Sequence, residues 1–115
     1  AIYEAVAEAL GPSYYERIDA PATPRRKAWL RSLKPQDLQL DQLGGEPVLS
    51  VEVASPRGEP FGGVRVKTRS GWFAARPSGT EPLNKIYAES FVSLDHLQAI
   101  QAGAQGALDA LSRGA

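Results

Sequence analysis

The segment from Val64 to Phe91 most constrains the fold, because it predicts three strands in succession. From Val64 to Arg69, one set of alternate side chains is apolar or uncharged and the other is basic, the pattern of a strand with one buried face and one wet face. Ser70-Gly71 predicts a turn into a strand over 72–75, so that the two strands form a hairpin. A further strand is predicted over 83–91, antiparallel to the one before it.

Helices and shorter strands are predicted around this segment. Apolar spacing predicts a helix over 2–10, ended by Gly11-Pro12, and a strand is predicted over 14–19. Thr23 is a suitable N-cap for a helix over 24–33, with proline at its first position. An irregular connection follows over 35–46, with three leucines expected to contact the core: Leu38, Leu40 and Leu43.

The remaining elements complete an α+β pattern. Alternation over 48–53 predicts a strand that buries Leu49, Val51 and Val53, and a loop is expected over 55–62. Ser93 is expected to cap a last helix with a buried apolar stripe formed by Leu94, Leu97, Ile100, Ala104, Ala107, Leu108 and Leu111. The order helix, strand, helix, four strands, helix predicts an antiparallel sheet with helices packed on one face.

The loop between the strands at 72–75 and 83–91 has the composition of an anion site. Arg76 offers a planar fork of donors to phosphate oxygens, and Ser78 and Thr80 add hydroxyl groups. Gly79 can take a positive φ, which would let backbone N–H groups converge on one anion. Lys85 follows on the next strand, within reach. The simpler interpretation is an ordinary hairpin turn, since proline, serine and glycine are common turn residues.

These residues also resemble a known family. Residues 72–81 (Trp-Phe-Ala-Ala-Arg-Pro-Ser-Gly-Thr-Glu) and 85–91 (Lys-Ile-Tyr-Ala-Glu-Ser-Phe) are similar to the phosphate loop and following strand in the fourth domain of α-D-phosphohexomutases. Residues 14–24 and 61–66 resemble the bacterial phosphoglucomutases of that superfamily. The resemblance covers almost the whole chain.

The resemblance implies a fold, a division of the chain and a function. It implies a TATA-binding-protein-like domain over 13–115, preceded over 1–12 by a linker helix from a third domain. In the complete enzyme, a phosphoserine would exchange phosphate with glucose 1-phosphate or glucose 6-phosphate through glucose 1,6-bisphosphate. This domain would bind the phosphate that is not transferred, through Arg76, Ser78, Gly79, Thr80 and Lys85.

The family's catalytic signatures are absent from the sequence. It contains no serine in a Ser-His-Asn context, no magnesium loop of alternating aspartates and no complete sugar-selecting loop. We therefore expect a phosphate-binding fragment with no catalytic residue, no metal and no cofactor of its own. The resemblance implies Mg²⁺ and glucose 1,6-bisphosphate for the full enzyme, with the sugar phosphate and the other three domains as partners.

Composition excludes several classes of protein. Thirteen basic and thirteen acidic side chains cancel, so no net charge favours nucleic acid or an anionic membrane. The chain lacks cysteine, and no apolar run approaches the roughly 20 residues that span a bilayer. We expect a cytoplasmic protein. The lack of methionine and a start at Ala1 within a predicted helix suggest a piece of a longer chain.

Several polar and aromatic residues are predicted to have structural roles. His96 is expected to be a solvated surface residue, and Arg65, Lys67 and Arg69 to form a solvated sheet face. Trp72 and Tyr87 could stack on a sugar, but core packing is favoured. Arg17 and Asp19 are expected to pair with little energetic effect.

Two alternatives remain open from the sequence. The domain could belong to a phosphoglucosamine or phosphomannose mutase, whose sugar-selecting loop would lie outside this chain. It could instead be a separate anion- or nucleic-acid-binding module that uses the basic strand face, with a steep dependence on salt.

Overall fold

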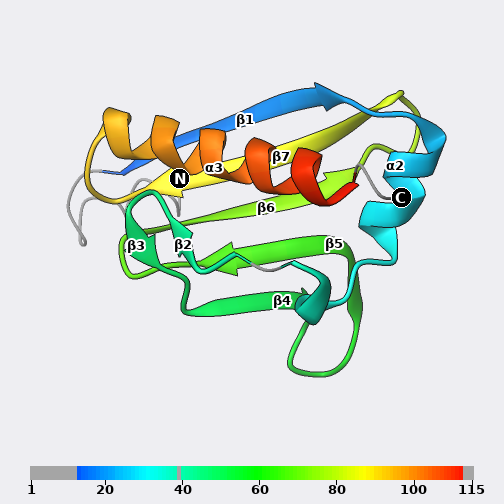
Figure 1. The fold of residues 1–115 in the computed structure, drawn as a ribbon, viewed down its shortest axis with the longest axis horizontal. Helices are drawn as coiled ribbons and strands as arrows, with labels where there is room; N and C mark the ends of the chain where they lie inside the picture. Colours follow the sequence, from blue (N-terminus) through cyan, green and yellow to red (C-terminus); the bar gives the residue numbers. More distant parts are fainter. Residues whose placement is uncertain (1–12, 39, 113–115) are drawn as a thin grey trace, which may run out of the picture.

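A five-stranded antiparallel sheet forms the centre of the molecule. The computed structural model describes residues 13–38 and 40–112, and Figure 1 shows the sheet with its strands in the order β1-β7-β6-β5-β4. The strands are β1 (Tyr14–Pro21), β4 (Ser50–Ala54), β5 (Pro60–Lys67), β6 (Gly71–Pro77) and β7 (Leu83–Ser90). The three strands predicted from the sequence between 64 and 91 are thus neighbours, and β1 pairs with the last of them.

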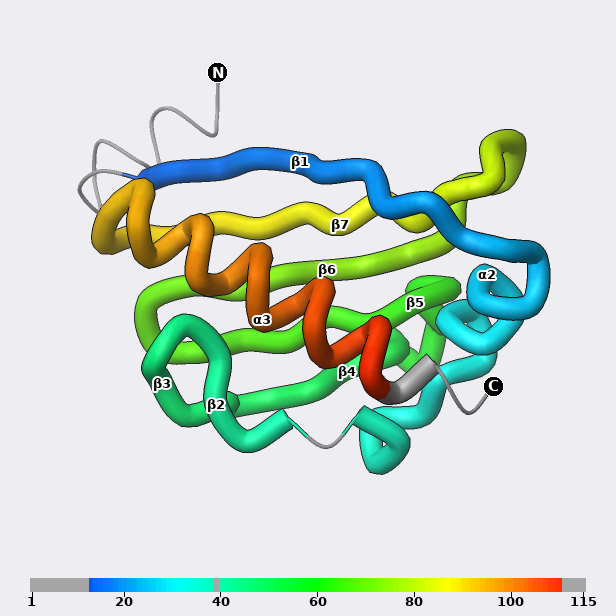
Figure 2. The backbone as a smooth tube through the Cα atoms, turned by 45° about the horizontal axis from the view of Figure 1, so that its top comes forward, coloured from blue at the N-terminus to red at the C-terminus, as the bar shows by residue number. Residues whose placement is uncertain are grey.

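Both α-helices of the described residues lie on one face of this sheet. They are α2 (Pro24–Arg31) and α3 (Leu94–Ser112), and Figure 2 shows α3 running across the strands while α2 lies near one end of the sheet. A single 3-10 turn, η1 (Pro35–Asp37), precedes a small hairpin of β2 (Gln42–Leu43) and β3 (Glu46–Pro47). The predicted α+β class, with an antiparallel sheet and helices on one face, is confirmed.

The core lies between the sheet and the two helices. Alternate residues of β5, β6 and β7 point into it, and they are Val64, Val66, Phe73, Ala75, Ile86 and Ala88. The helices and connections contribute Leu30, Leu33, Leu38, Leu43, Leu97, Ile100, Ala104 and Leu108. Because side chains alternate along a strand, the residues between these project from the other face, which α2 and α3 do not cover. We call it the open face.

The predicted helix starts are confirmed by their caps. The Thr23 hydroxyl accepts a hydrogen bond from the N–H of Arg26 at 3.2 Å, with Pro24 at the first helical position. The Ser93 hydroxyl accepts from the N–H of His96 at 3.0 Å. Short polar side chains therefore set where each helix begins.

Two predictions about buried leucines are wrong. Leu49 is 68% exposed, because it precedes β4 at the sheet edge rather than lying within a covered strand. Leu94 is 54% exposed at the first position of α3. The predicted helix over 2–10, with the linker role of residues 1–12, lies outside the described residues, as does the side chain of Leu111.

The connection before β4 is more regular than predicted. Gly44 and Gly45 have φ of 60° and 83°, and the hairpin of β2 and β3 turns at them. Two successive positive φ angles define the turn that suits a two-residue hairpin loop, so the Gly-Gly pair was a signal that the sequence offered. The loop predicted over 55–62 is shorter than expected, since β5 already begins at Pro60.

Candidate functional site

The candidate site lies where β6 ends and β7 begins, beside α2 (Figure 1). Arg76 on β6 and Lys85 on β7 are directly opposite each other in the strand register, and both project from the open face. Directly opposed side chains have Cβ atoms about 4.5–5.5 Å apart, and like charges in that arrangement destabilise a sheet. Asp19 lies opposite Lys85 on the other side, but its carboxylate pairs with Arg17 at 3.4 Å. The two cations thus share a position suited to an anion.

A cavity of about 350 Å³ opens beside these two cations. Its lining is formed by Arg31, Phe61, Gly62, Arg76, Pro77, Ser78, Gly79 and Lys85. Three of these side chains are basic and none is acidic. We call this space the loop cavity. It brings together four of the five residues predicted to bind phosphate; the fifth, Thr80, is exposed in the same loop but does not line the cavity.

The loop itself is held by its own hydrogen bonds. Ser78 is 4% exposed, and its hydroxyl accepts from the N–H groups of Thr80 at 3.3 Å and Glu81 at 3.2 Å. The N–H of Ser78 donates to the carbonyl of Leu83 at 3.0 Å. Much of the donor capacity of the loop backbone is therefore used to fix its shape, and the cations at its side carry the charge of the site.

The expectation of a positive φ at Gly79 is wrong, since the positive φ angles of described residues are at other glycines. A Cβ built on Gly79 would meet nothing within 4 Å. The glycine is thus required neither by backbone conformation nor by packing within this chain. A side chain at this position would point into open space beside the loop cavity.

Helix α2 supports the loop, which the sequence did not reveal. The Lys27 ammonium donates to the carbonyl of Glu81 at 2.7 Å, and Arg31 lines the loop cavity one turn further along the helix. Residues four apart share a helix face, so one side of α2 faces the loop. The spacing of Lys27 and Arg31 was visible in the sequence, but the same spacing is usual on a solvated helix face. Only the packing of α2 against the sheet distinguishes a helix face that contacts the loop from a solvated one.

Comparisons with known proteins agree with this geometry. Residues 46–105, just over half of the chain, match the model of the phosphoglucomutase/phosphomannomutase C-terminal domain. The chain belongs to that family. A phosphoglucomutase from Komagataeibacter xylinus is 53% identical over 112 residues. That match covers 96% of this chain and 20% of the relative, so the chain spans about a fifth of the length of the protein it resembles.

The open face of this mutase domain carries a second, larger hollow. It has a volume of about 460 Å³ and is lined by Phe61, Val64, Arg65, Lys67, Trp72, Ala74, Ala75, Arg76 and Tyr87. We call it the sheet hollow. The prediction that Trp72 and Tyr87 pack in the core is wrong, because both alternate with the buried residues of their strands and project from the open face. Their positions in the alternation of β6 and β7, rather than their apolar character, decide which face of the sheet their side chains occupy.

The basic row on β5 is partly neutralised. Arg65 Nε and Lys67 Nζ lie 3.3 Å and 3.4 Å from the same oxygen of Glu52 on β4. Burial raises the pKa of the Glu52 carboxyl, but hydrogen bonds from Lys67 and Arg65 outweigh it and the pKa lies below its ordinary value. The pair on β5 thus keeps less free charge than Arg76 and Lys85.

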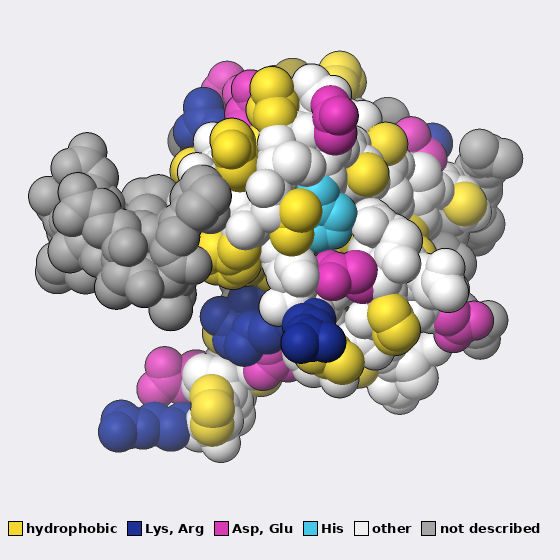
Figure 3. Space-filling view, turned by 90° about the vertical axis from the view of Figure 1, so that its left-hand side faces the viewer, with side chains coloured by type: hydrophobic (Ala, Val, Ile, Leu, Met, Phe, Trp, Pro, Cys, Tyr) yellow, Lys and Arg dark blue, Asp and Glu magenta, His cyan; other side chains and the backbone are white. Residues whose placement is uncertain are grey.

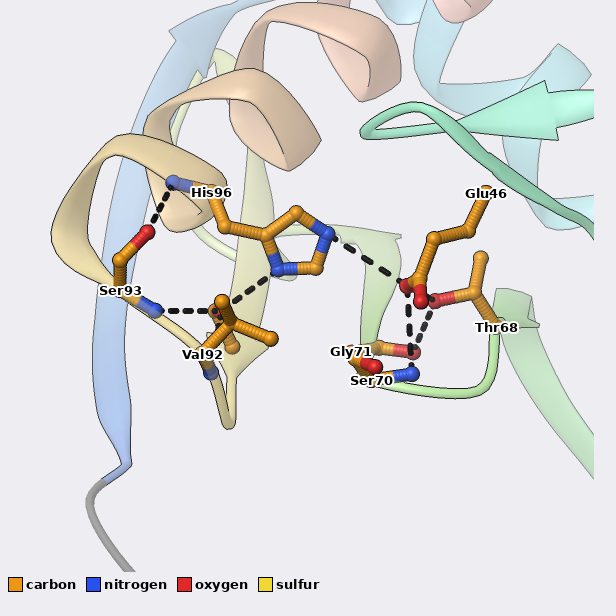
Figure 4. Close-up of polar contacts among 8 residues, drawn as sticks. Glu46, Thr68, Ser70, Gly71, Val92, Ser93 and His96 are labelled. Atoms are coloured by element: carbon orange, nitrogen blue, oxygen red, sulfur yellow. Dashed lines mark hydrogen bonds and ion pairs between the residues drawn. The ribbon is translucent and has the colours of Figure 1, made fainter.

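His96 is not the solvated surface residue that the sequence predicted. Its side chain, shown in Figure 4, is 11% exposed. Nδ1 lies 2.6 Å from the hydroxyl of the fully buried Ser90. That hydroxyl also accepts hydrogen bonds from the N–H groups of Val92 at 3.0 Å and Ser93 at 3.4 Å. Nε2 lies 3.4 Å from Glu46 on β3. Figure 3 shows the one histidine of the chain at this end of the molecule, among acidic and hydrophobic side chains.

Glu46 joins this network to the turn between β5 and β6. Its Oε1 accepts from the Thr68 hydroxyl at 2.9 Å and from the N–H of Ser70 at 3.2 Å. Burial raises the pKa of the Glu46 carboxyl, but the hydrogen bonds from Ser70 and Thr68 more than offset it, and the pKa lies below its ordinary value. Serine, histidine and glutamate match a hydrolase triad only in residue type, because Ser90 is inaccessible to a substrate. The network joins β3, α3 and the turn after β5.

Metal-binding clusters and membrane-spanning helices are absent from the part of the chain that the structure describes. Residues 13–38 and 40–112 contain no group of three or more His, Asp or Glu side chains placed to hold a metal ion. Neither α2 nor α3 has the length and apolar character of a membrane-spanning helix.

Proposed function

We propose that this chain is the C-terminal domain of a phosphoglucomutase that interconverts glucose 1-phosphate and glucose 6-phosphate, and that its loop cavity binds the phosphate that is not transferred. The observation that carries the proposal is the opposed pair of Arg76 and Lys85 beside a cavity without acidic lining. An anion between two opposed cations replaces their repulsion by two attractions. Charge-assisted hydrogen bonds from a guanidinium to phosphate are about twice as strong as neutral ones.

The phosphate contacts in this proposal come from three elements. Arg76 and Lys85 approach the anion from β6 and β7, and Arg31 approaches it from α2 as a third cation. Gly79 lets the ligand come close to the loop backbone, while Ser78 holds the loop in shape. Thr80 completes the predicted set from the exposed side of the loop.

A site built this way suits both orientations of the sugar phosphate. It recognises charge and reads no hydroxyl group, so it accepts a phosphate on C1 or on C6. Holding the remote phosphate supplies binding energy that positions the reacting end of the sugar. The domain therefore contributes to the rate without a catalytic residue of its own.

The chemistry itself is assigned to the rest of the parent protein. We assign the phosphoserine, the Mg²⁺ that would stabilise the charge of the transferring phosphoryl group, and the contacts to glucose 1,6-bisphosphate to the other three domains. The cytoplasmic location predicted from the sequence is kept as part of this proposal. Phosphoglucosamine and phosphomannose mutases remain the alternative parents, distinguished by a sugar-selecting loop that this chain does not contain.

The alternative of a nucleic-acid module is less well supported. It would need free positive charge along β5, but Glu52 pairs with both Arg65 and Lys67. The unpaired charge in the lining of the two cavities is concentrated at the loop, where three basic side chains line one space of about 350 Å³.

An NMR titration of the ¹⁵N-labelled chain tests the proposed function. We expect glucose 1-phosphate and glucose 6-phosphate to shift the amide signals of Arg76, Gly79, Thr80 and Lys85, and plain glucose to leave them in place. Arg76→Ala should raise the ligand concentration needed for half of these shifts about tenfold or more. Arg69→Ala, which removes an exposed arginine outside both cavities, is the matched control. An unmoved loop, or an affinity that Arg76→Ala leaves unchanged, would overturn the proposal.

A further inference from the structure

We propose that the sheet hollow is a subsite for the hexose ring of the sugar phosphate, with its floor at Ala74. This inference rests on the proposed function, because it takes the phosphate to be bound at the loop cavity. The ligand class is a neutral polyhydroxyl ring attached to a phosphate. Nothing in the phosphate loop itself would recognise such a ring.

The hollow is a consequence of strand register. Ala74 on β6 lies opposite Arg65 on β5 and Tyr87 on β7, so a single methyl group stands between two long side chains. Trp72 and Arg76, two residues away along β6, project from the same face and bound the hollow at either end. Its volume of about 460 Å³ is within the usual range of ligand sites.

The hollow adjoins the loop cavity. Phe61 and Arg76 line both spaces. The Arg76 guanidinium carbon also lies 5.8 Å from the centre of the Tyr87 ring, so the group that would hold the phosphate stands at the entrance to the hollow. A hexose joined to that phosphate therefore lies next to the hollow without any change in the strands.

The lining matches a sugar better than a second phosphate. Three aromatic side chains, Phe61, Trp72 and Tyr87, offer apolar surface to the C–H groups of a pyranose ring. The Trp72 indole is fixed by a hydrogen bond from Nε1 to Glu89 at 2.9 Å. Arg65 and Lys67 retain donors for hydroxyl groups, while their shared contact with Glu52 lowers their attraction for another anion.

Such a subsite preserves tolerance of sugar orientation. Contact between an aromatic face and a pyranose face depends on area rather than on one hydroxyl group. The ring can thus be reversed, as interconversion of the two glucose phosphates requires, without loss of the contact. Specific reading of hydroxyl groups would be left to other parts of the parent protein.

The first test compares two ligands on the ¹⁵N-labelled chain. Inorganic phosphate should move the loop signals alone, whereas glucose 6-phosphate should also move the Trp72 indole N–H and the amides of Ala74 and Tyr87. The Trp29 indole packs against the core beneath the sheet and serves as the internal reference. If glucose 6-phosphate moves the loop but leaves Trp72, Ala74 and Tyr87 unmoved, the subsite is overturned and the proposed function stands.

The second test fills the hollow. Ala74→Leu should weaken binding of glucose 6-phosphate by about threefold or more, the loss expected for one aromatic contact, and leave binding of inorganic phosphate unchanged. Ala74→Ser, which adds one atom, is the matched control. It should bind both ligands with the affinity of the unsubstituted chain. The subsite would be overturned if Ala74→Leu and the unsubstituted chain bound glucose 6-phosphate with equal affinity. A loop that responds to neither ligand would instead overturn the proposed function.

Discussion

Arg76 and Lys85 stand directly opposite each other on β6 and β7, although both are cations. The nearest acidic position in this row, Asp19, directs its carboxylate to Arg17. Opposed like charges cost stability in a sheet unless an anion lies between them. The strand register therefore places the two cations where the proposed phosphate would separate them.

Replacing Arg76 tests this link directly. Arg76→Ala should weaken phosphate binding about tenfold or more, since a hydrogen bond to a charged group contributes about 1.5–3 kcal/mol. In phosphate-free buffer the free energy of unfolding should change little, because the substitution also removes the repulsion from Lys85. NMR titration measures the first effect and urea unfolding the second. A large loss of stability without loss of binding would contradict the assignment.

Arg31 is predicted to add to the same site from α2. As one partly solvated charge it contributes up to about 1 kcal/mol, so Arg31→Ala should weaken phosphate binding by up to about fivefold. The effect should shrink as salt concentration rises. Arg25→Ala, on the same helix but outside both cavities, should bind phosphate normally. If Arg31→Ala and Arg25→Ala bound phosphate with the same affinity, Arg31 would not contribute to the site.

Two glycines should respond differently to alanine. Gly79→Ala should leave the free energy of unfolding unchanged or raise it by up to about 1 kcal/mol, since a Cβ there meets no atom of the chain and φ is not positive. It should nevertheless weaken phosphate binding, because the added methyl group meets the ligand. Gly63→Ala should lower stability by about 1–3 kcal/mol, as its Cβ would collide with the Ala75 carbonyl. Thermal unfolding of both variants measures the stability changes, and phosphate titration measures binding. Unchanged phosphate binding by Gly79→Ala would contradict a close approach of the ligand to Gly79.

Stability should fall in acid partly through Glu46. Its folded pKa lies below the ordinary value of 4.5, so the ionised carboxylate stabilises the fold above that value. This contribution is lost as pH falls through the folded pKa. The free energy of unfolding should therefore drop as the pH falls below about 4.5, and less so in Glu46→Gln. Glu59→Gln changes an exposed position, and its free energy of unfolding should depend on pH as that of the unsubstituted chain does. If the free energy of unfolding changed with pH in the same way for the unsubstituted chain and for Glu46→Gln, the stabilising role of the Glu46 carboxylate would be excluded.

The sheet could be predicted from the sequence because its signals are local. Alternation from Val64 to Thr68 puts Val64 and Val66 in the core, as expected, and Thr23 and Ser93 cap the helices they precede. Leu49 and Leu94 were wrongly expected to be buried, because apolar spacing does not say where the covering layer ends. The hairpin at Gly44-Gly45 was not predicted, although its turn chemistry was present.

The site was predictable only in part. Arg76, Ser78, Gly79 and Lys85 are close in sequence, and the strand register brings them to one cavity. Arg31 is distant in sequence and belongs to a helix whose basic face looks like a solvated one. His96 was expected at the surface, but Ser90 and Glu46 enclose it from two other elements.

The sequence by itself determined the class of fold, the position of the loop proposed to bind phosphate and the resemblance to the phosphohexomutases, because strand alternation, helix caps and loop composition are properties of neighbouring residues. Only the tertiary structure decided that Trp72 and Tyr87 face outward, that α2 supports the loop through Lys27, and that Arg76 joins two cavities. These features depend on which strands pair and in what register. Such pairing joins residues far apart in the chain, and no local pattern records it.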